Sequence, residues 1–216
     1  MSDNKEKSRE FFNKNAKRYS KSREGAFTMP MYQEMITRVL SKKPKKVLDL
    51  GCGSGILLKQ LNDTNNNIEL FGLDIADEMI KIADESLKGC AELKVGDCEK
   101  IPWDSDTFDV VFCNASFHHY PNPNKALLEV NRVLKSNGTL IIGDPTAPVV
   151  IRDIMNFFIR FSNSGDVRIY NEDEILDLLK EANFTPNNFK LLKWNKFFIN
   201  ADVNKYLSWY YGWRFK

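Results

Sequence analysis

A glycine-rich segment preceded by an acidic residue is the part of this sequence best suited to bind a small ligand. The stretch Val-Leu-Asp-Leu-Gly-Cys-Gly-Ser-Gly places Asp49 near the end of an apolar strand and runs directly into a loop that opens a helix. Gly51, Gly53 and Gly55 permit a tight turn, and they let backbone N–H groups approach a ligand without side-chain interference. We therefore expect these glycines, together with Cys52, to contact a nucleotide-type cofactor.

The spacing of the glycines separates two classes of cofactor. A dinucleotide presents a pyrophosphate, and its usual G-x-G-x-x-G spacing brings a helix N-terminus to that charge, whereas the present loop reads G-x-G-x-G. The carboxylate of Asp49 would repel a pyrophosphate, but it could hold the ammonium of a methionine tail directly or through water. The pattern therefore favours S-adenosylmethionine over NAD. The alternative without a ligand is a tight structural turn.

A second acidic residue follows the next apolar strand. Asp74 ends this strand roughly 20 residues after the glycine loop, where a carboxylate can bind both hydroxyls of a ribose. Ile75 follows directly, and Met79 lies about one helical turn further on, where its side chain could cover an adenine. An aspartate at a strand end is also a common helix cap, and Met79 could equally be an ordinary core residue.

Two further strands end in polar residues at the same expected edge of the sheet. Asp97, followed by Cys98, could accept a hydrogen bond from the adenine amino group, and Asn114 ends the strand after that. Ligands of open α/β sheets bind outside the carboxyl ends of the strands. Four strand ends therefore converge on one predicted crevice.

The two histidines of the chain, His118 and His119, follow the fourth strand at the point where a methyl acceptor would enter. One of them could act as a general base that removes a proton from the acceptor. The alternative is that they cap the next helix or brace the loop. The four cysteines lie far apart without a Cys-x-x-Cys pair, so we expect no metal site.

Together these blocks resemble the class I S-adenosylmethionine-dependent methyltransferase superfamily, in particular the ubiquinone/menaquinone-type and related small-molecule methyltransferases. The similarity covers about residues 46–144. It is carried by the loop from Asp49 to Gly55, by Asp74, and by the segments Gly96-Asp97-Cys98-Glu99, Ile101-Pro102-Trp103, Phe108-Asp109 and Leu128 to Lys135. The sequence departs from the family pattern at Ser136-Asn137-Gly138, where Pro-Gly-Gly is often found, and at Asn122, where an aspartate usually follows the histidine pair.

The resemblance implies an α/β fold, a doubly wound, mostly parallel seven-stranded Rossmann-like sheet with helices on both faces and an antiparallel last strand. It also implies that Tyr19 folds over the methionine end of the cofactor, and that the pocket is lined by Asp49, Gly51, Gly53, Asp74, Asp97 and Asn114. The implied activity is methyl transfer to a small, partly apolar acceptor by in-line displacement at the sulfonium, which leaves S-adenosylhomocysteine. Three alternatives stay open: a methyltransferase acting on RNA or protein, a nicotinamide oxidoreductase, and a nucleotide-cofactor-binding protein without transfer activity.

The hydrophobic pattern predicts the sheet that these residues need. From Lys46 onward, short apolar runs alternate with helical stripes, which is typical of βαβ units and a parallel sheet. We predict strands at Lys46–Leu50, Ile68–Ile75, Ala91–Val95, Val110–Asn114, Thr139–Gly143, Phe189–Trp194 and Lys196–Ala201. We predict helices at Gly55–Asn62, Asp77–Leu87 and Asn124–Leu134, and a further helix that begins after Asn171.

We expect one domain, with an N-terminal helical cap (1–45), a cofactor-binding core (46–144) and a last part with a lid helix, a further helix and the final strands (145–216). The polar start, Met1 to Glu10, is expected to fray, and Thr28 with Pro30 is expected to begin a helix. Val149–Phe161 is too apolar for a half-buried surface helix. We expect it to cover the methyl group together with Tyr19 and Tyr170, or to form a homodimer surface.

Composition names no macromolecular partner. The formal net charge of +2 gives no global field toward nucleic acid, and the aromatic tail from Tyr206 to Arg214 has no basic stripe that would favour RNA. The apolar runs are far shorter than the roughly 20 residues needed to cross a bilayer. With no secretory peptide and no paired cysteines, we expect a cytoplasmic protein with reduced thiols.

Overall fold

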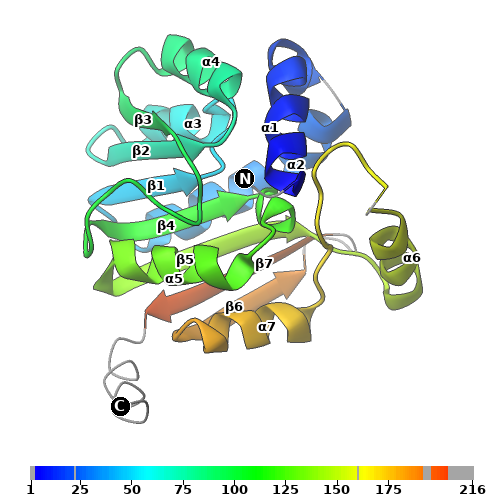
Figure 1. Cartoon of the computed structure of the whole chain (residues 1–216). Helices are drawn as coiled ribbons and strands as arrows, with labels where there is room; N and C mark the ends of the chain where they lie inside the picture. Colours follow the sequence, from blue (N-terminus) through cyan, green and yellow to red (C-terminus); the bar gives the residue numbers. More distant parts are fainter. Residues whose placement is uncertain (1–2, 22, 160, 192–195, 204–216) are drawn as a thin grey trace.

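A computed structural model of the chain describes residues 3–21, 23–159, 161–191 and 196–203. Seven strands form one sheet in the order β3-β2-β1-β4-β5-β7-β6 (Figure 1). The strands are β1 (Lys46–Leu50), β2 (Glu69–Asp74), β3 (Ala91–Val95), β4 (Phe108–Asn114), β5 (Leu134–Pro145), β6 (Phe184–Leu191) and β7 (Lys196–Val203). Every predicted strand is present, with bounds that differ by a few residues at most places.

The sheet is mixed, which corrects the expectation of a mostly parallel sheet. Strands β3, β2, β1, β4 and β5 pair in parallel, whereas β7 pairs antiparallel with both β5 and β6. Parallel neighbours need a crossover of a dozen or more residues. Only four residues separate the end of β6 from the start of β7, so these two strands can pair only as antiparallel neighbours.

Helices pack on both faces of the sheet (Figure 1). One buried cluster joins β1, β2 and β4 to α2 (Arg23–Ser41), α3 (Ile56–Thr64) and α4 (Asp77–Leu87). The other face is covered by α5 (Pro123–Val133) and α7 (Glu172–Glu181). Alternating βα units put the apolar stripe of each helix on the sheet, and this arrangement aligns the carboxyl ends of β1, β2, β3 and β4 at one edge.

From Asp3 onward the N-terminal segment is helical, whereas the polar sequence from Met1 to Glu10 was expected to fray. Helix α1 spans Asp3–Asn15 and continues into a 3-10 helix, η1 (Ala16–Lys21). Polar side chains hold α1 in place: the Asn13 amide donates to Asp77 (2.8 Å) and accepts from the backbone N–H of Glu78 (3.0 Å). The start of α2 also differs from the prediction, because α2 begins at Arg23 and contains Pro30 in its interior.

Helix α6 (Val149–Ile159) projects from the sheet edge with its apolar side chains exposed (Figure 1). Val150 is 71% exposed and Phe158 is 61% exposed, and a buried arginine, Arg152, faces inward. Among the described residues, no helix has the length and apolarity that a membrane crossing requires. The aromatic tail from Tyr206 to Arg214 lies outside the described residues.

Candidate functional site

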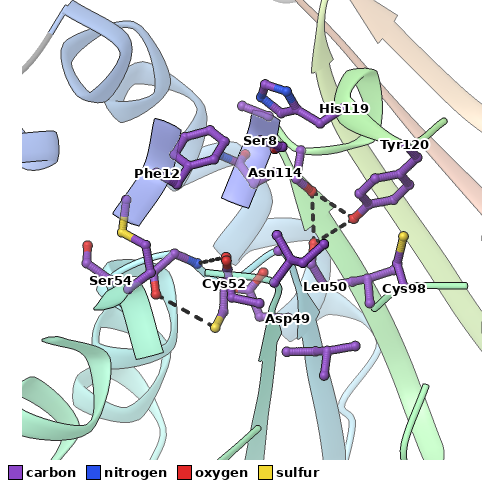
Figure 2. A pocket seen from close by; sticks show the side chains of 18 of the residues that line it. Ser8, Phe12, Asp49, Leu50, Cys52, Ser54, Cys98, Asn114, His119 and Tyr120 are labelled. Carbon is purple, nitrogen blue, oxygen red and sulfur yellow. Dashed lines mark hydrogen bonds between the residues drawn. The ribbon is translucent and has the colours of Figure 1, made fainter. Parts of the chain in front are cut away.

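A deep pocket lies at the carboxyl ends of β1, β2, β3 and β4. It encloses about 1030 Å³, counting its open mouth, and it sits where the strand order reverses between β1 and β4. Open α/β sheets bind ligands at this switch point because the βα loops on either side diverge there. The predicted crevice therefore exists, and α1 covers it, as Figure 2 shows for Ser8 and Phe12.

Asp49 is the buried acid of the pocket. It is 2% exposed and lines the cavity, and among the described residues no lysine or arginine forms an ion pair with it. Burial, reinforced by the nearby carboxylate of Asp74, raises the pKa of Asp49 well above its ordinary value. A buried carboxylate without a cation is costly, so an ammonium group entering the pocket would relieve that cost.

The glycine loop presents backbone to the pocket. Gly51 (φ +81°) passes so close to Ser116 that a Cβ would lie 2.6 Å from the serine Cβ, whereas a Cβ on Gly53 (φ +52°) would meet nothing within 4 Å. Gly53 and Ala76 donate their backbone N–H groups to the two oxygens of Asp74, at 2.8 and 2.9 Å. Each oxygen keeps a second lone pair that can accept from a ribose hydroxyl.

Lys5 of α1 closes the pocket at the end of β3. Its ammonium lies 2.6 Å from Asp97 and 2.7 Å from Glu99, and its side chain is only 9% exposed. Burial alone would lower the pKa of Lys5, but the two carboxylates raise it, so the lysine stays charged. The expected adenine acceptor, Asp97, is thus joined to α1 across the pocket.

Asn114 and the neighbouring hydroxyls form the floor near β4. Ser116 and Tyr120 both donate to the carbonyl of Leu50, at 2.8 and 3.0 Å, and their oxygens lie 3.0 Å apart (Figure 2). These bonds fix the end of β1 against the loop after β4. The side-chain oxygen of Asn114 is buried and has no hydrogen-bond partner among the described residues, which leaves it available to a ligand.

The two histidines occupy different environments in η2 (Phe117–His119). His119 lines the pocket and packs edge-on against Phe12, with ring centroids 5.2 Å apart. Burial and the neighbouring His118 lower the pKa of His119 to about 3. His118 points to Asp144, 3.1 Å away. Burial alone would lower the pKa of His118, but that carboxylate raises it.

Most predicted site residues come together at this pocket. The structure places these predicted residues in its wall: Tyr19, Asp49, Gly51, Cys52, Gly53, Asp74, Ile75, Met79, Asp97, Cys98, Asn114 and His119. Gly55 does not line it; a Cβ there would lie 3.0 Å from Ala83 and Leu87, so this glycine lets α3 approach α4. His118 also lies outside the lining.

Two groups of lining residues were missed from the sequence. Lys5, Ser8 and Phe12 come from α1, and Thr28, Tyr32, Ser116 and Tyr120 come from α2 and the loop after β4. The helical spacing of Phe11, Phe12 and Ala16 was the available signal for α1. No described residue of Val149–Phe161 lines the pocket, and Tyr170 packs against Phe117 instead. The expected cover is therefore supplied by α1.

Comparisons with known proteins agree with this geometry. A family model described as a methyltransferase domain matches residues 48–142. The demethylmenaquinone methyltransferase of Thermotoga maritima is 29% identical over 173 residues, which cover 70% of this chain and 75% of that protein. The ubiquinone/menaquinone biosynthesis C-methyltransferase of a Geobacter species is 32% identical over 122 residues, and the match spans about half of each chain (52%).

The fold agrees as well. The solved structure of a SAM-dependent methyltransferase from Aquifex aeolicus superposes with a TM-score of 0.64 at 23% identity, covering 78% of this chain and 89% of that one. The matched family segment carries β1, β2, β3 and β4, whose ends build the pocket. Residues 48–142 therefore form a methyltransferase domain of the class I S-adenosylmethionine-dependent type, with S-adenosylmethionine as its cofactor.

Proposed function

We propose that this enzyme transfers the methyl group of S-adenosylmethionine to a small, partly apolar acceptor inside the α1-covered pocket. The observation that carries the proposal is that one cavity combines Asp49, which is buried and forms no ion pair with the described residues, with an aromatic wall of Phe12, Tyr19 and His119. Named relatives that methylate quinone precursors support an acceptor of this class.

The residues present fit the cofactor on structural grounds. Asp49 offers a carboxylate to the ammonium of the methionine part, Gly53 leaves open space for close approach, and Asp74 keeps lone pairs for ribose. When bound, S-adenosylmethionine supplies a methyl group already activated by its positive sulfur. The protein has to hold the acceptor in line and exclude water, and α1 contributes to the second task by covering the cavity.

Neither histidine is well suited to remove a proton from the acceptor, so methyl transfer depends mainly on the nucleophilicity of the acceptor itself. A group with a pKa of about 3, such as His119, is neutral at physiological pH and accepts a proton weakly, because an efficient general base has a pKa near the operating pH. His118 faces Asp144 and does not line the cavity. An acceptor that is already ionised, or whose oxygen is held by another group, suits this arrangement.

Calorimetry with S-adenosylmethionine, S-adenosylhomocysteine and NAD tests the cofactor assignment. We expect the two sulfur compounds to bind with one site per chain and NAD not to bind. Incubation with metabolite extracts and a donor that carries a labelled methyl group then tests transfer to a small molecule. Label that appears in RNA or protein but in no small molecule would contradict the proposal, and so would binding of NAD alone.

A further inference from the structure

Three potential metal ligands meet beside the pocket, and they come from two distant segments of the chain. His118 Nε2 lies 3.6 Å from Asp166 Oδ1, and His119 Nδ1 lies 3.0 Å from the same oxygen. One donor atom from each of the three side chains can be chosen so that all lie within 4.8 Å of one another. Ligand atoms around a single ion, with bonds of about 2.0–2.2 Å, lie roughly 3.0–3.4 Å apart, so small side-chain adjustments bring this set to a common centre.

The groups behind the histidines are those that support metal ligands in proteins. His118 Nδ1 lies 3.1 Å from Asp144 Oδ1, and Asp144 is fully buried. A donated Nδ1–H leaves the Nε2 lone pair of His118 facing Asp166. A ligating histidine almost always gives its other N–H to a carboxylate, a backbone carbonyl or water. Here a buried carboxylate fixes the ring orientation that ligation through Nε2 requires.

The cluster also leaves buried atoms without partners. His119 Nδ1 and Asp144 Oδ2 are buried, and neither makes a hydrogen bond with the described residues. His119 Nδ1 is close to Asp166, but the contact lacks hydrogen-bond geometry. An unpartnered buried nitrogen is costly. A cation placed between the His119 ring and Asp166 would give His119 Nδ1 a partner.

We propose that His118 Nε2, His119 Nδ1 and an oxygen of Asp166 bind one divalent transition-metal ion beside the acceptor pocket, next to the lining residue His119. Two imidazoles and one carboxylate suit ions such as Zn²⁺, Fe²⁺ or Mn²⁺ better than Mg²⁺ or Ca²⁺, which prefer oxygen ligands. Three protein ligands leave at least one coordination position open, which is the arrangement of catalytic metal sites and not of closed structural ones.

The position of the site gives it a role. His119 lines the pocket beside Phe12, in the upper part of the view in Figure 2, whereas Asp49 and Cys52 lie in the lower part. The open coordination position of the ion would bind an oxygen of the acceptor, such as a phenolate or enolate, and fix it in the pocket. The ion would thereby stabilise the ionised form of the acceptor. This role rests on the proposed function. Metal binding itself does not depend on that role.

Histidine NMR tests the site directly, because the chain contains two histidines. The full-length protein, without a histidine tag, is labelled with ¹⁵N in both imidazole rings and titrated with Zn²⁺. We expect saturation at one Zn²⁺ per chain, with the metal-bound nitrogen signature at Nε2 of His118 and at Nδ1 of His119. His118 should keep its proton on Nδ1. Unchanged ring signals at one equivalent, or ligation through other nitrogens, would overturn the assignment.

Variants test the same site by calorimetry with Zn²⁺. His118→Gln or Asp166→Asn should weaken Zn²⁺ binding at least 100-fold, and Asp144→Asn, which removes the group behind a ligand, should weaken it about 10- to 100-fold. Asp173→Asn removes an exposed carboxylate of α7 outside the cluster and serves as the matched control, with unchanged affinity. Cys90→Ser controls for the exposed thiol and should also leave one site per chain. Equal affinity in Asp166→Asn and Asp173→Asn would refute the site.

Failure of the metal site and failure of the proposed function are separable. Calorimetry with S-adenosylhomocysteine reports on the Asp49 side of the pocket without any metal. Zn²⁺ binding with the expected ring signature but no binding of S-adenosylhomocysteine would support the metal site and contradict the proposed function. The opposite result would leave the methyltransferase proposal standing and remove the metal ion from it.

Discussion

Replacement of Asp49 by asparagine should stabilise the ligand-free protein and weaken its binding of the cofactor. The carboxylate is 2% exposed, and burial together with Asp74 raises its pKa. A raised pKa in the folded state means that this group favours folding only at low pH, and that the benefit is lost as the pH rises through the raised value. Asparagine removes the charge, so the variant should unfold at a higher temperature than the wild type near pH 7.

The pH dependence gives the sign a separate check. The stability gain of Asp49→Asn should shrink as the pH falls toward about 4, where the unfolded carboxyl of the wild type also becomes protonated. Asp109 is the matched control with the opposite sign. Burial would raise its pKa, but Lys135 and the backbone N–H groups of Lys46 and Lys45 lower it. Asp109→Asn should therefore lower the free energy of unfolding by roughly 1–2 kcal/mol near pH 7. For a chain of this size, each kcal/mol lowers the melting temperature by about 2–4 °C.

The affinity loss is measured with two ligands that differ only in the methionine tail. A charge-assisted hydrogen bond is worth about 1.5–3 kcal/mol, so Asp49→Asn should weaken S-adenosylhomocysteine binding roughly 10- to 100-fold by calorimetry. Methylthioadenosine, which lacks the amino-acid tail, should bind the variant and the wild type equally. Asp74→Asn should weaken both ligands, because both carry the ribose. An equal loss of both ligands in Asp49→Asn would refute the assigned contact.

Four further substitutions test the pocket and a helix cap outside it. Lys5→Met removes the nearest cation of the buried Glu99 and leaves it only the exposed Lys125 at 3.5 Å, so it should loosen α1 and raise the dissociation rate of S-adenosylhomocysteine about tenfold in stopped-flow traces. An unchanged rate would mean that α1 does not close the pocket. Gly51→Ala places a Cβ 2.6 Å from the Cβ of Ser116 and should lower the free energy of unfolding in denaturant by about 2 kcal/mol or more. Gly53→Ala should lower it by about 1 kcal/mol, and it should weaken cofactor binding by more than that. Asn171→Ala removes the side-chain oxygen that accepts from the backbone N–H of Glu174, which is one of the two bonds of a capping box, and should cost about 1 kcal/mol in unfolding with cofactor affinity unchanged. A change in affinity would contradict this purely structural role.

The pocket residues at the carboxyl ends of the strands were predictable from the sequence. Asp49, the glycine loop, Asp74, Asp97 and Asn114 each lie within a few residues of the end of a strand, and hydrophobic periodicity placed those strands close to their observed bounds. Parallel strands joined by helices must end at the same edge of a sheet. Local pattern and this one topological rule were therefore sufficient to bring five dispersed positions to one pocket.

The sequence did not predict which distant side chains would complete that pocket. Lys5 contacts Asp97, which lies 92 residues further along the chain. The polar N-terminal sequence was expected to fray, because local composition does not show that a charged side chain will find a buried partner far away in the sequence. The prediction that Val149–Phe161 covers the pocket failed because apolar side chains indicate that a surface can be buried, but not which surface buries it. In the structure the apolar face of α6 is exposed.

The histidine cluster shows the same division. The sequence itself places His118 beside His119 and both after the fourth strand, and a role in catalysis or in bracing the loop could be inferred from that position. Only the tertiary structure brings Asp144 from the end of β5 and Asp166 from the segment after α6 against the two rings. Ring orientation, burial and pKa depend on those contacts, because electrostatic interactions act across space at distances of a few ångströms, whatever the separation along the chain.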